Sequence, residues 1–482
     1  MLDLLVIGGG ITGAGVARIA ARNGLTVAVL ERGDLMSGAS SASSHMLHGG
    51  LRYLEHGRFG LVREALEERA AVARMAPHLA RPRRFLVPVY RDGRFGAWTL
   101  RAGLLLYDFL AGGRGLAPHA YVARKEVLSL EPGLAKDGLR GAGLYSDAVM
   151  DDGRIGIAVA RDASMHGAQV HTYTECIGAR PVQGGGFEVI AHDVLEGGER
   201  TFQARVLVNA TGPWTDNVRT RLSNALRPGA PDPVPMLRPS RGVHLVYPGL
   251  TNGHGLLLAS PIDGRVFFVV PFEGRSLVGT TEVEVASPAP PNAAVPTIEE
   301  IRYLRESLAR VLPAHANDAP LAVIGGVRPL VAAAGQIGRA SREHAIRDED
   351  GVITITGGKY TTFRVMASDV LRAVLARLGQ ANRSVIDSED PLPLEPGAGS
   401  EPEAIIRHAI DVSFARRIED VVRRRTPWWL DADRGRGAAS RTADVMARHF
   451  GWDAERRSTE LQSYETLLFE EERLLHRSRE AS

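Results

Sequence analysis

Cysteine is nearly absent from this sequence, since only Cys176 occurs among its 482 residues. A single cysteine forms no disulfide within the chain and cannot hold an iron–sulfur cluster by itself. Long apolar runs are missing as well: no stretch approaches 18 uncharged apolar residues, so no membrane-spanning helix is predicted. The chain starts on a strand-like segment instead of a basic and apolar leader, so we expect no signal peptide and a cytoplasmic location.

An excess of charge of either sign is also missing. The 58 Lys and Arg residues against 56 Asp and Glu residues leave a formal net charge of +2, so no nucleic-acid partner is expected. No metal site is expected either. A chain of this length exceeds the size of one hydrophobic core, which predicts two or three domains. What the sequence does have is glycine: its 53 glycines indicate many tight turns or close approaches of the backbone to a ligand.

A strand, a glycine-rich turn and a helix open the chain in the order used by dinucleotide-binding domains. The turn, GGGITG, places Gly8, Gly10 and Gly13 in the pattern G-x-G-x-x-G. A second predicted strand ends on Glu31, 18 residues after the last of these glycines. The glycines allow a pyrophosphate to approach, the helix N-terminus stabilises its charge, and the acid can bind a ribose diol. We predict that these four residues bind a dinucleotide.

The fingerprint does not separate NAD from FAD, but the segment that follows favours a flavin. Residues 37–44 are small, with little strand periodicity. Small residues let an extended chain lie against a flat ligand, whereas a solvated loop is the alternative interpretation. Three later predicted strands also end in turns that suit a ligand: "NATGPW", "GVRPL" with Arg328, and "TGGKYTT" with Lys359. Ligands of doubly wound sheets bind outside the carboxyl ends of the strands. An exposed lysine is the alternative for Lys359.

These stretches, taken together, resemble the FAD-dependent sn-glycerol-3-phosphate dehydrogenase family, within the amino-acid-oxidase-like two-domain flavoproteins. The motifs that carry the resemblance are "VIGGGITGAG", "SSASSHMLHGGLRYLEHGRFGLVREAL", "YSDAVMDDGRIGIAVARDA", "NATGPWTD", "LVGTTE", "GVRPL" and "TGGKYTTFRVMA", followed by "TPWWLDAD" and "VMARHFGWD". The long second motif is the most particular of them.

The resemblance implies an α/β fold with a Rossmann-like FAD-binding domain, a β-sheet substrate domain and a C-terminal helical cap. The first two domains are each assembled from separate pieces of the chain. The expected pieces are 1–75, 145–225 and 322–380 for the FAD-binding domain, 76–144 and 226–321 for the substrate domain, and 386–482 for a linker and the cap.

The resemblance also implies which residues bind the cofactor and the substrate. Residues Arg52, Tyr53, Arg328 and Arg342 are expected at the substrate, because guanidinium groups bind a phosphate bidentately and keep their charge. The expected FAD-binding residues are Gly8, Gly10, Gly13, Glu31, Ser40, Ser41, Ser44, Gly49, Gly50, Thr211, Gly212, Trp214, Arg328, Gly358, Lys359 and Thr361.

The implied reaction is oxidation of sn-glycerol 3-phosphate to dihydroxyacetone phosphate by hydride transfer to FAD. A base near neutral pH is needed, for which His244 is the first candidate and Lys359 and His48 are the others. The electrons would pass to a membrane quinone. An oxidase that uses oxygen, a related flavin enzyme for another small hydroxy or amino acid, and a non-catalytic flavoprotein remain open, as does a homodimer.

Residues 95–111, "FGAWTLRAGLLLYDFLA", combine aromatic, leucine and arginine residues. This composition suits an interfacial helix on anionic lipid, which would place the protein peripherally on the inner face of the cell membrane. A buried helix of the substrate domain is the alternative. The basic run Arg423–Arg425 is expected to be a solvated helix end.

Overall fold

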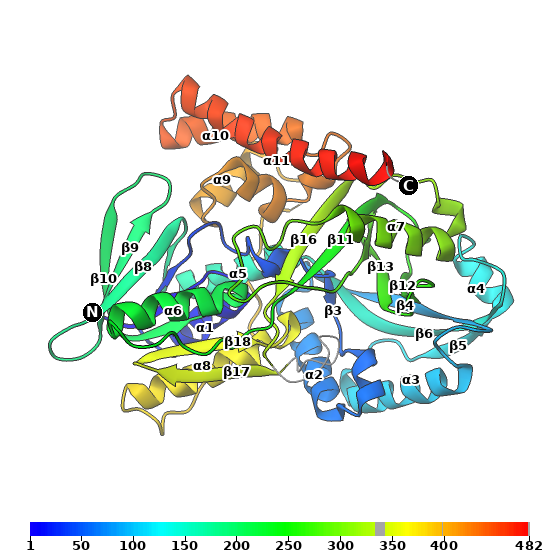
Figure 1. The fold of residues 1–482 in the computed structure, drawn as a ribbon, viewed down its shortest axis with the longest axis horizontal. Helices are drawn as coiled ribbons and strands as arrows, with labels where there is room; N and C mark the ends of the chain where they lie inside the picture. The colour runs from blue at the N-terminus through cyan, green and yellow to red at the C-terminus, as the bar shows by residue number, and fades with distance from the viewer. Residues whose placement is uncertain (333–342, 398, 481–482) are drawn as a thin grey trace.

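The computed structural model describes residues 1–332, 343–397 and 399–480. The described strands form two sheets that lie toward opposite ends of the molecule, with helices on their faces (Figure 1). The α/β class and the helical C-terminal cap predicted from the sequence are confirmed.

The first sheet has a parallel centre in the order β18-β10-β1-β2-β7. Antiparallel strands add to it, because β17 pairs with β18 and β9, itself paired with β8, pairs with β10. The central strands are short apolar runs such as "LLVI" and "VAVL", as expected for a parallel sheet covered on both faces. Its strands are β1 (Leu2–Ile7), β2 (Val27–Leu30), β7 (Gln169–His171), β8 (Thr174–Pro181), β9 (Phe187–Asp193), β10 (Glu199–Asn209), β17 (His344–Glu349) and β18 (Val352–Gly357).

Helices cover both faces of this sheet. Helices α1 (Ile11–Arg22) and α8 (Phe363–Arg377) pack their apolar sides on one face, and α6 (Thr215–Leu226) contributes to a core on the other. A Cβ on Gly15 would lie 2.9 Å from the ring of Phe363, so this glycine allows α1 and α8 to approach closely. Helix α5 (Asp152–Met165) packs beside α1.

The second sheet is mixed and runs in the order β15-β11-β14-β13-β12-β4-β6-β3, with β16 paired to β11 and β5 paired to β6. Helix α7 (Ile298–Val311) covers one face, and its capping box at Thr297 and Glu300 fixes its start. The strands are β3 (Met46–Leu47), β4 (Ala80–Tyr90), β5 (Ala120–Ala123), β6 (Leu139–Met150), β11 (Ser240–Pro248), β12 (Gly255–Ala259), β13 (Val266–Phe272), β14 (Arg275–Gly279), β15 (Val283–Glu284) and β16 (Ala322–Arg328).

The expected domain pieces stay predictions, and two strands cross their limits. Strand β6 continues past residue 144 within the second sheet, and β16 pairs along its length with β11 although residues 322–380 were assigned to the FAD-binding part. Strand β16 therefore belongs to the second sheet and carries the chain back toward β17 and β18.

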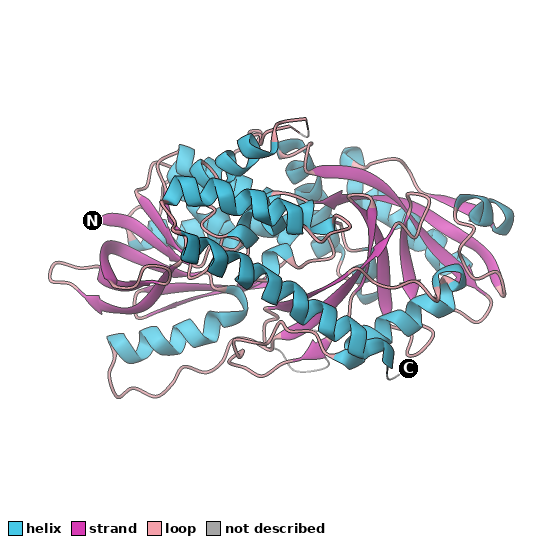
Figure 2. Cartoon of the chain, turned by 90° about the horizontal axis from the view of Figure 1, so that it is seen from above, coloured by secondary structure: helices cyan, strands magenta, loops and turns pink. Residues whose placement is uncertain are grey.

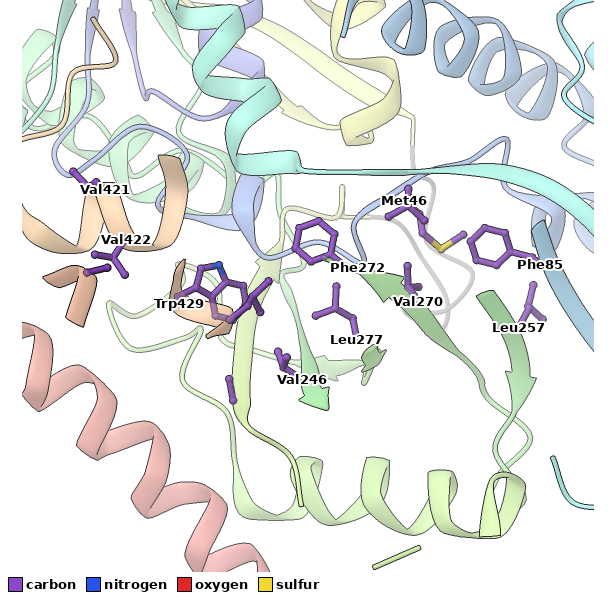
Figure 3. Close-up of a cluster of buried hydrophobic side chains, with 14 of the residues drawn as sticks. Met46, Phe85, Val246, Leu257, Val270, Phe272, Leu277, Val421, Val422 and Trp429 are labelled. Atoms are coloured by element: carbon purple, nitrogen blue, oxygen red, sulfur yellow. The ribbon is translucent and has the colours of Figure 1, made fainter. Parts of the chain in front are cut away.

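The C-terminal cap consists of α9 (Pro402–Asp411), a π-helical turn (Asp420–Arg425), α10 (Arg436–Phe450) and α11 (Ala454–Glu480). Helix α11 runs along the molecule toward the second sheet, where it packs on α7 and β16 (Figure 2). One buried cluster joins the cap to that sheet: in Figure 3, Trp429 lies between Val421 and Val422 on its left and Phe272 and Leu277 on its right. The cap is thus part of the core and not an appendage.

Helix α3 (Ala97–Ala111) has two apolar faces. One is buried, as the alternative interpretation of residues 95–111 expected, and the interfacial interpretation stays a prediction for the other. Leu104 and Tyr107 are buried in the core, whereas Trp98, Leu105 and Phe109 are 80%, 64% and 78% exposed. Within the described chain, no helix has the length and apolarity required to cross a bilayer. The other helices are α2 (Phe59–Met75) and α4 (Arg124–Leu130).

The expectation for Arg423–Arg425 is wrong. The side chains of Arg424 and Arg425 are buried in the π-helical turn, where they form ion pairs with Asp34 and Asp420. The reason is that carboxylates neutralise them, and one of these, Asp34, comes from a distant part of the chain, which a run of like charges in the sequence does not reveal.

Candidate active site

A cavity of about 370 Å³ lies at the carboxyl edge of the first sheet. Four of its lining residues follow or end parallel strands: Gly8 after β1, Glu31 after β2, Ala210 after β10 and Gly357 at the end of β18. This is the place where an open α/β sheet binds its ligand. The predicted cofactor residues that line it are Gly8, Gly10, Glu31, Ser40, Thr211, Gly212, Trp214, Gly358 and Lys359.

The fingerprint glycines shape the N-terminus of α1. A Cβ on Gly13 would lie 1.9 Å from the carbonyl oxygen of Gly8, and a Cβ on Gly8 would lie 2.7 Å from that of Ala210. Gly13 therefore permits the tight turn without lining the cavity. The first turn of α1 contains no acid, and the backbone N–H of Ile11 donates to Ser40 Oγ at 3.0 Å. This helix end is a favourable position for a phosphate.

Glu31 is held by backbone donors on both carboxylate oxygens. The N–H of Gly9 donates to Oε2 at 2.6 Å and the N–H of Gly33 donates to Oε1 at 2.9 Å. Burial raises the pKa of Glu31, and these two donors oppose that rise. Each oxygen retains a second lone pair, so the carboxylate can still accept from a ribose hydroxyl.

An aromatic ring also lines the first cavity. The guanidinium of Arg32 lies over the ring of Trp214, 4.5 Å from its centroid. The Nε1 of Trp214 has no hydrogen-bond partner among the residues described. A Cβ on Gly38 would lie 3.1 Å from the indole, so the glycine brings the chain close to it. Thr211 is fixed by Asn209, whose Oδ1 accepts from the threonine hydroxyl at 2.7 Å.

A second, smaller cavity of about 180 Å³ adjoins the first and shares Lys359, Gly358 and Tyr360 with it. It brings together residues from segments far apart in the sequence. The predicted residues that line it are Ser44, His48, Tyr53, His244, Arg328, Gly358, Lys359 and Thr361. All three candidate bases are among them.

His244 lies on β11, between β14 and β16. Its Nε2 forms a hydrogen bond of 2.9 Å with Ser44 Oγ, whereas Nδ1 has no partner among the described residues. Burial, together with the nearby Arg328, lowers the pKa of His244 to about 3. The ring is therefore neutral near pH 7. A Cβ on Gly279 would lie 2.4 Å from the imidazole, so this glycine on β14 makes room for it.

Arg328 ends β16, and its guanidinium is held by the neighbouring turn. Its Nη2 donates to Thr280 Oγ1 at 2.6 Å and to the carbonyl oxygen of Thr281 at 3.2 Å. A Cβ on Gly242 would lie 2.1 Å from Nη2. The "LVGTTE" and "SRGV" segments therefore fix this cation at the cavity.

Lys359 and Tyr53 form a pair across the second cavity, with Nζ at 4.1 Å from the ring centroid. Gly50, in a left-handed conformation, turns the chain before Tyr53, and the N–H of Gly49 donates to the hydroxyl of Tyr107 at 2.9 Å. Neither glycine lines the first or the second cavity.

One other predicted residue, Ser41, lines neither of these two cavities. The Oγ of Ser41 donates to the carbonyl oxygen of Met36 at 2.8 Å, so this serine shapes the loop. Arg342 lies outside the described residues, and of Arg52 only the backbone is described, in a short helical segment.

Sequence reasoning missed a support beneath Ser44. Asp152, the first residue of α5, accepts from the backbone N–H of Ser43 at 3.1 Å and from its hydroxyl at 2.6 Å, and that hydroxyl accepts from the N–H of His45. The residues on both sides of Ser44 are thereby fixed opposite His244. The paired acids of "MDDGRIG", between a strand and a helix, were the available signal.

FAD fits the residues that are present. Glu31 suits a ribose, the open N-terminus of α1 suits the pyrophosphate, and the glycines keep the backbone close to both. The first cavity continues into the second, so a ring system there would lie beside His244 and Arg328. We expect FAD, when bound, to supply the two-electron redox chemistry that these side chains lack.

Comparisons with known proteins identify the family of this chain. The family described as FAD dependent oxidoreductase matches residues 3–364, and the C-terminal domain of alpha-glycerophosphate oxidase matches residues 360–457. The glycerol-3-phosphate dehydrogenase of Mycobacterium leprae is 37% identical over 386 residues, which are 78% of this chain and 63% of that protein. The aerobic glycerol-3-phosphate dehydrogenase of Staphylococcus aureus is 35% identical over 385 residues, 78% of this chain and 67% of that protein. The match thus spans less than two thirds of the mycobacterial relative.

Among solved structures, the glycerol-3-phosphate dehydrogenase of Bacillus halodurans complexed with FAD has a TM-score of 0.75 at 24% identity, covering 98% of this chain and 95% of that one. This likeness confirms the predicted fold, from the FAD-binding domain to the cap. The chain belongs to the FAD-dependent oxidoreductases and, within them, to the glycerol-3-phosphate dehydrogenase family.

Proposed function

We propose that this protein oxidises sn-glycerol 3-phosphate to dihydroxyacetone phosphate with FAD as the hydride acceptor. The observation that carries the proposal is the second cavity, in which the cation of Arg328 and the neutral imidazole of His244 face the same space next to the first cavity. The names of the relatives support the same substrate.

Arg328 binds the phosphate in this proposal. Its guanidinium is already oriented by Thr280 and Thr281, so little side-chain entropy is lost when the substrate arrives. Tyr53 and Lys359 close the cavity from the other side, and Arg52 and Arg342 remain proposed phosphate ligands from the resemblance.

His244 takes the proton of the C2 hydroxyl. A pKa of about 3 makes the free ring a weak base, but one cause of that low value is the charge of Arg328. A phosphate dianion bound to Arg328 offsets this charge and raises the pKa of the imidazole toward the useful range. Substrate binding thus activates its own base, while Ser44 holds the ring in place. His48 and Lys359 are the alternatives.

Anaerobic mixing with glycerol 3-phosphate tests the proposal. The flavin absorbance should bleach with glycerol 3-phosphate and persist with glycerol, which lacks the phosphate. Arg328→Ala should mainly raise KM, by about 10-fold to 100-fold, because a charged hydrogen-bonded contact contributes about 1.5–3 kcal/mol. Arg140→Ala, at an exposed position on β6, is the matched control and should leave KM unchanged. Equal bleaching by both compounds would favour a flavin enzyme for another small hydroxy or amino acid. If neither compound bleaches the flavin, a non-catalytic flavoprotein is favoured.

We also propose that the electrons pass to a membrane quinone and that the protein lies peripherally on the inner face of the cell membrane. The support is the outward face of α3, where Trp98, Leu105 and Phe109 are exposed beside Arg101. Such a face suits insertion into an anionic bilayer surface. Rapid reoxidation by oxygen without quinone would favour the oxidase alternative. A homodimer is proposed from the resemblance alone, and the molar mass in solution, measured by light scattering, tests it.

A further inference from the structure

A buried ion cluster connects the cap to the loop that follows Glu31. Asp34, in that loop, accepts from Arg424 Nε at 2.5 Å and from Arg425 Nη2 at 2.7 Å, and Arg425 Nη1 also bonds to it. The side chains of Asp34, Arg424 and Arg425 are 1%, 8% and 3% exposed. We refer to these three residues as the cap clamp.

The cap clamp is braced from inside the cap. Asp420 accepts from Arg424 Nη2 at 2.8 Å, and Arg425 also donates to the carbonyl oxygen of Ser413. Removing these charges from water is unfavourable unless each is paired, so the arrangement is tolerated only while Asp34 is in position. The position of Asp34 is therefore tied to the folded cap.

Asp34 is in turn tied to the first cavity. It stands three residues after Glu31, and Glu31 Oε1 accepts from the N–H of Gly33. The N–H of Met36 donates to the carbonyl oxygen of Gly9 at 3.2 Å, which fastens the far side of the loop to the fingerprint turn. Asp34 therefore lies between two hydrogen bonds that hold the loop in place.

A second connection runs in parallel through Tyr173. Its backbone N–H donates to the carbonyl oxygen of Gly33 at 2.9 Å, and its hydroxyl donates to Asp420 Oδ1 at 2.8 Å. The loop and the cap are thus joined both directly and through one tyrosine.

We propose that Asp34, Arg424 and Arg425 are positioning residues for FAD, through which the cap holds Glu31 and the fingerprint turn in their cofactor-binding arrangement. The proposal rests on the FAD site assigned above. Because coupling between two equilibria is reciprocal, bound FAD must also stabilise the cap. Neither arginine lines the first cavity, so they act through the loop and not by contact with the cofactor.

The chain offers a matched control for a test. Glu471, on α11, accepts from Arg423 Nη1 at 2.6 Å and from Arg434, and its side chain is 15% exposed. Like Asp34, it is a largely buried carboxylate paired with two cap arginines, but both partners stay within the cap. Asp34→Asn and Glu471→Gln each remove one such charge without changing the shape of the side chain.

The experiment measures FAD release from the two holoenzymes by the fluorescence of free FAD, and cap protection by hydrogen exchange with and without FAD. Asp34→Asn should release FAD about 10-fold to 100-fold faster than wild type, the range set by one charged contact. Glu471→Gln should release it at the wild-type rate even where it lowers the melting temperature. FAD should protect residues 420–425 in wild type and much less in Asp34→Asn, and Asp34→Glu should restore part of the retention.

Equal release rates for Asp34→Asn and wild type would overturn the inference, as would equally accelerated release from both variants, because the effect would then be general loosening. If wild type itself binds no FAD, the proposed function fails first. If Asp34→Asn does not fold, Arg424→Lys, which keeps the charge but loses the fork, replaces it with the same expected outcomes.

Discussion

Replacing Tyr107 with Phe removes a single oxygen atom from the middle of a buried hydrogen-bond network. The hydroxyl of Tyr107 donates to Asp147 Oδ1 at 2.8 Å and accepts from the N–H of Gly49 at 2.9 Å. Asp147 also accepts a hydrogen bond from Arg69 Nη1 at 2.8 Å. Tyr107, Asp147 and Arg69 are each at most 2% exposed. Burial raises the pKa of Tyr107 well above its usual value, so the hydroxyl keeps its proton and donates.

The size of the effect follows from what is left unpaired. A hydrogen bond to a charged group contributes about 1.5–3 kcal/mol, and a buried N–H that loses its acceptor costs about 1–3 kcal/mol. The N–H of Gly49 retains a contact of 3.4 Å with Asp147 Oδ1, so the second loss is partial. We therefore expect Tyr107→Phe to lower the free energy of unfolding by about 2–3 kcal/mol.

Urea denaturation of the holoenzyme, followed by tryptophan and flavin fluorescence, measures this change. Tyr145→Phe is the matched control, because its ring lies 6.0 Å from that of Tyr107 and it leaves the contacts of Tyr107 intact. If the two variants lose the same free energy of unfolding, the reasoning is refuted, because the loss would then not come from the Gly49–Tyr107–Asp147 contacts.

Three further outcomes are expected. Gly13→Ala should give a colourless protein whose supernatant after denaturation contains no FAD, since the added Cβ would lie 1.9 Å from the carbonyl oxygen of Gly8. Because the folded-state pKa of His244 is lowered to about 3, below its unfolded value, its neutral burial stabilises the fold above that unfolded value and this stability is lost as the pH falls. The contribution of His244 to the free energy of unfolding should drop by up to about 1.4 kcal/mol per pH unit from pH 6 to pH 4, so the total should fall more steeply in wild type than in His244→Asn; parallel slopes would contradict this. Leu105→Ser with Phe109→Ser should abolish co-sedimentation with anionic vesicles and leave the melting temperature within a few degrees, since both side chains are exposed; a collapse in stability would instead make this face part of the core.

The first cavity was predictable because many of its lining residues belong to short, contiguous sequence motifs. Gly8, Gly10 and Glu31 belong to one strand–turn–helix–strand unit, whose geometry follows from the spacing alone. The turns after β10 and β18 were recognisable for the same reason: apolar runs that stop at small residues mark the carboxyl ends of parallel strands. Local pattern was enough to predict one edge of one sheet.

The second cavity needed more than local pattern. Ser44 and His244 meet across 200 residues, and Arg328 reaches the same space from β16. Nothing in the spacing of these residues fixes that encounter, which depends on β11 pairing with both β14 and β16. The resemblance supplied the candidates, and the support from Asp152 was missed because its partners lie 109 positions away.

The basic run at Arg423–Arg425 shows why charge patterns are the least informative part of this sequence. A run of arginines is solvated unless carboxylates from elsewhere accompany it into the interior, and the nearest sequence offers only Glu419 and Asp420. The decisive partner, Asp34, is 391 positions from Arg425 and is itself an unremarkable acid in a loop. Burial of either residue alone would be strongly unfavourable, so neither has a preference that a local pattern could express. The pairing exists only when the cap packs on the FAD-binding domain. For that reason we expect the position of the cap to affect the arrangement of Glu31 and the fingerprint turn, and with it the retention of FAD.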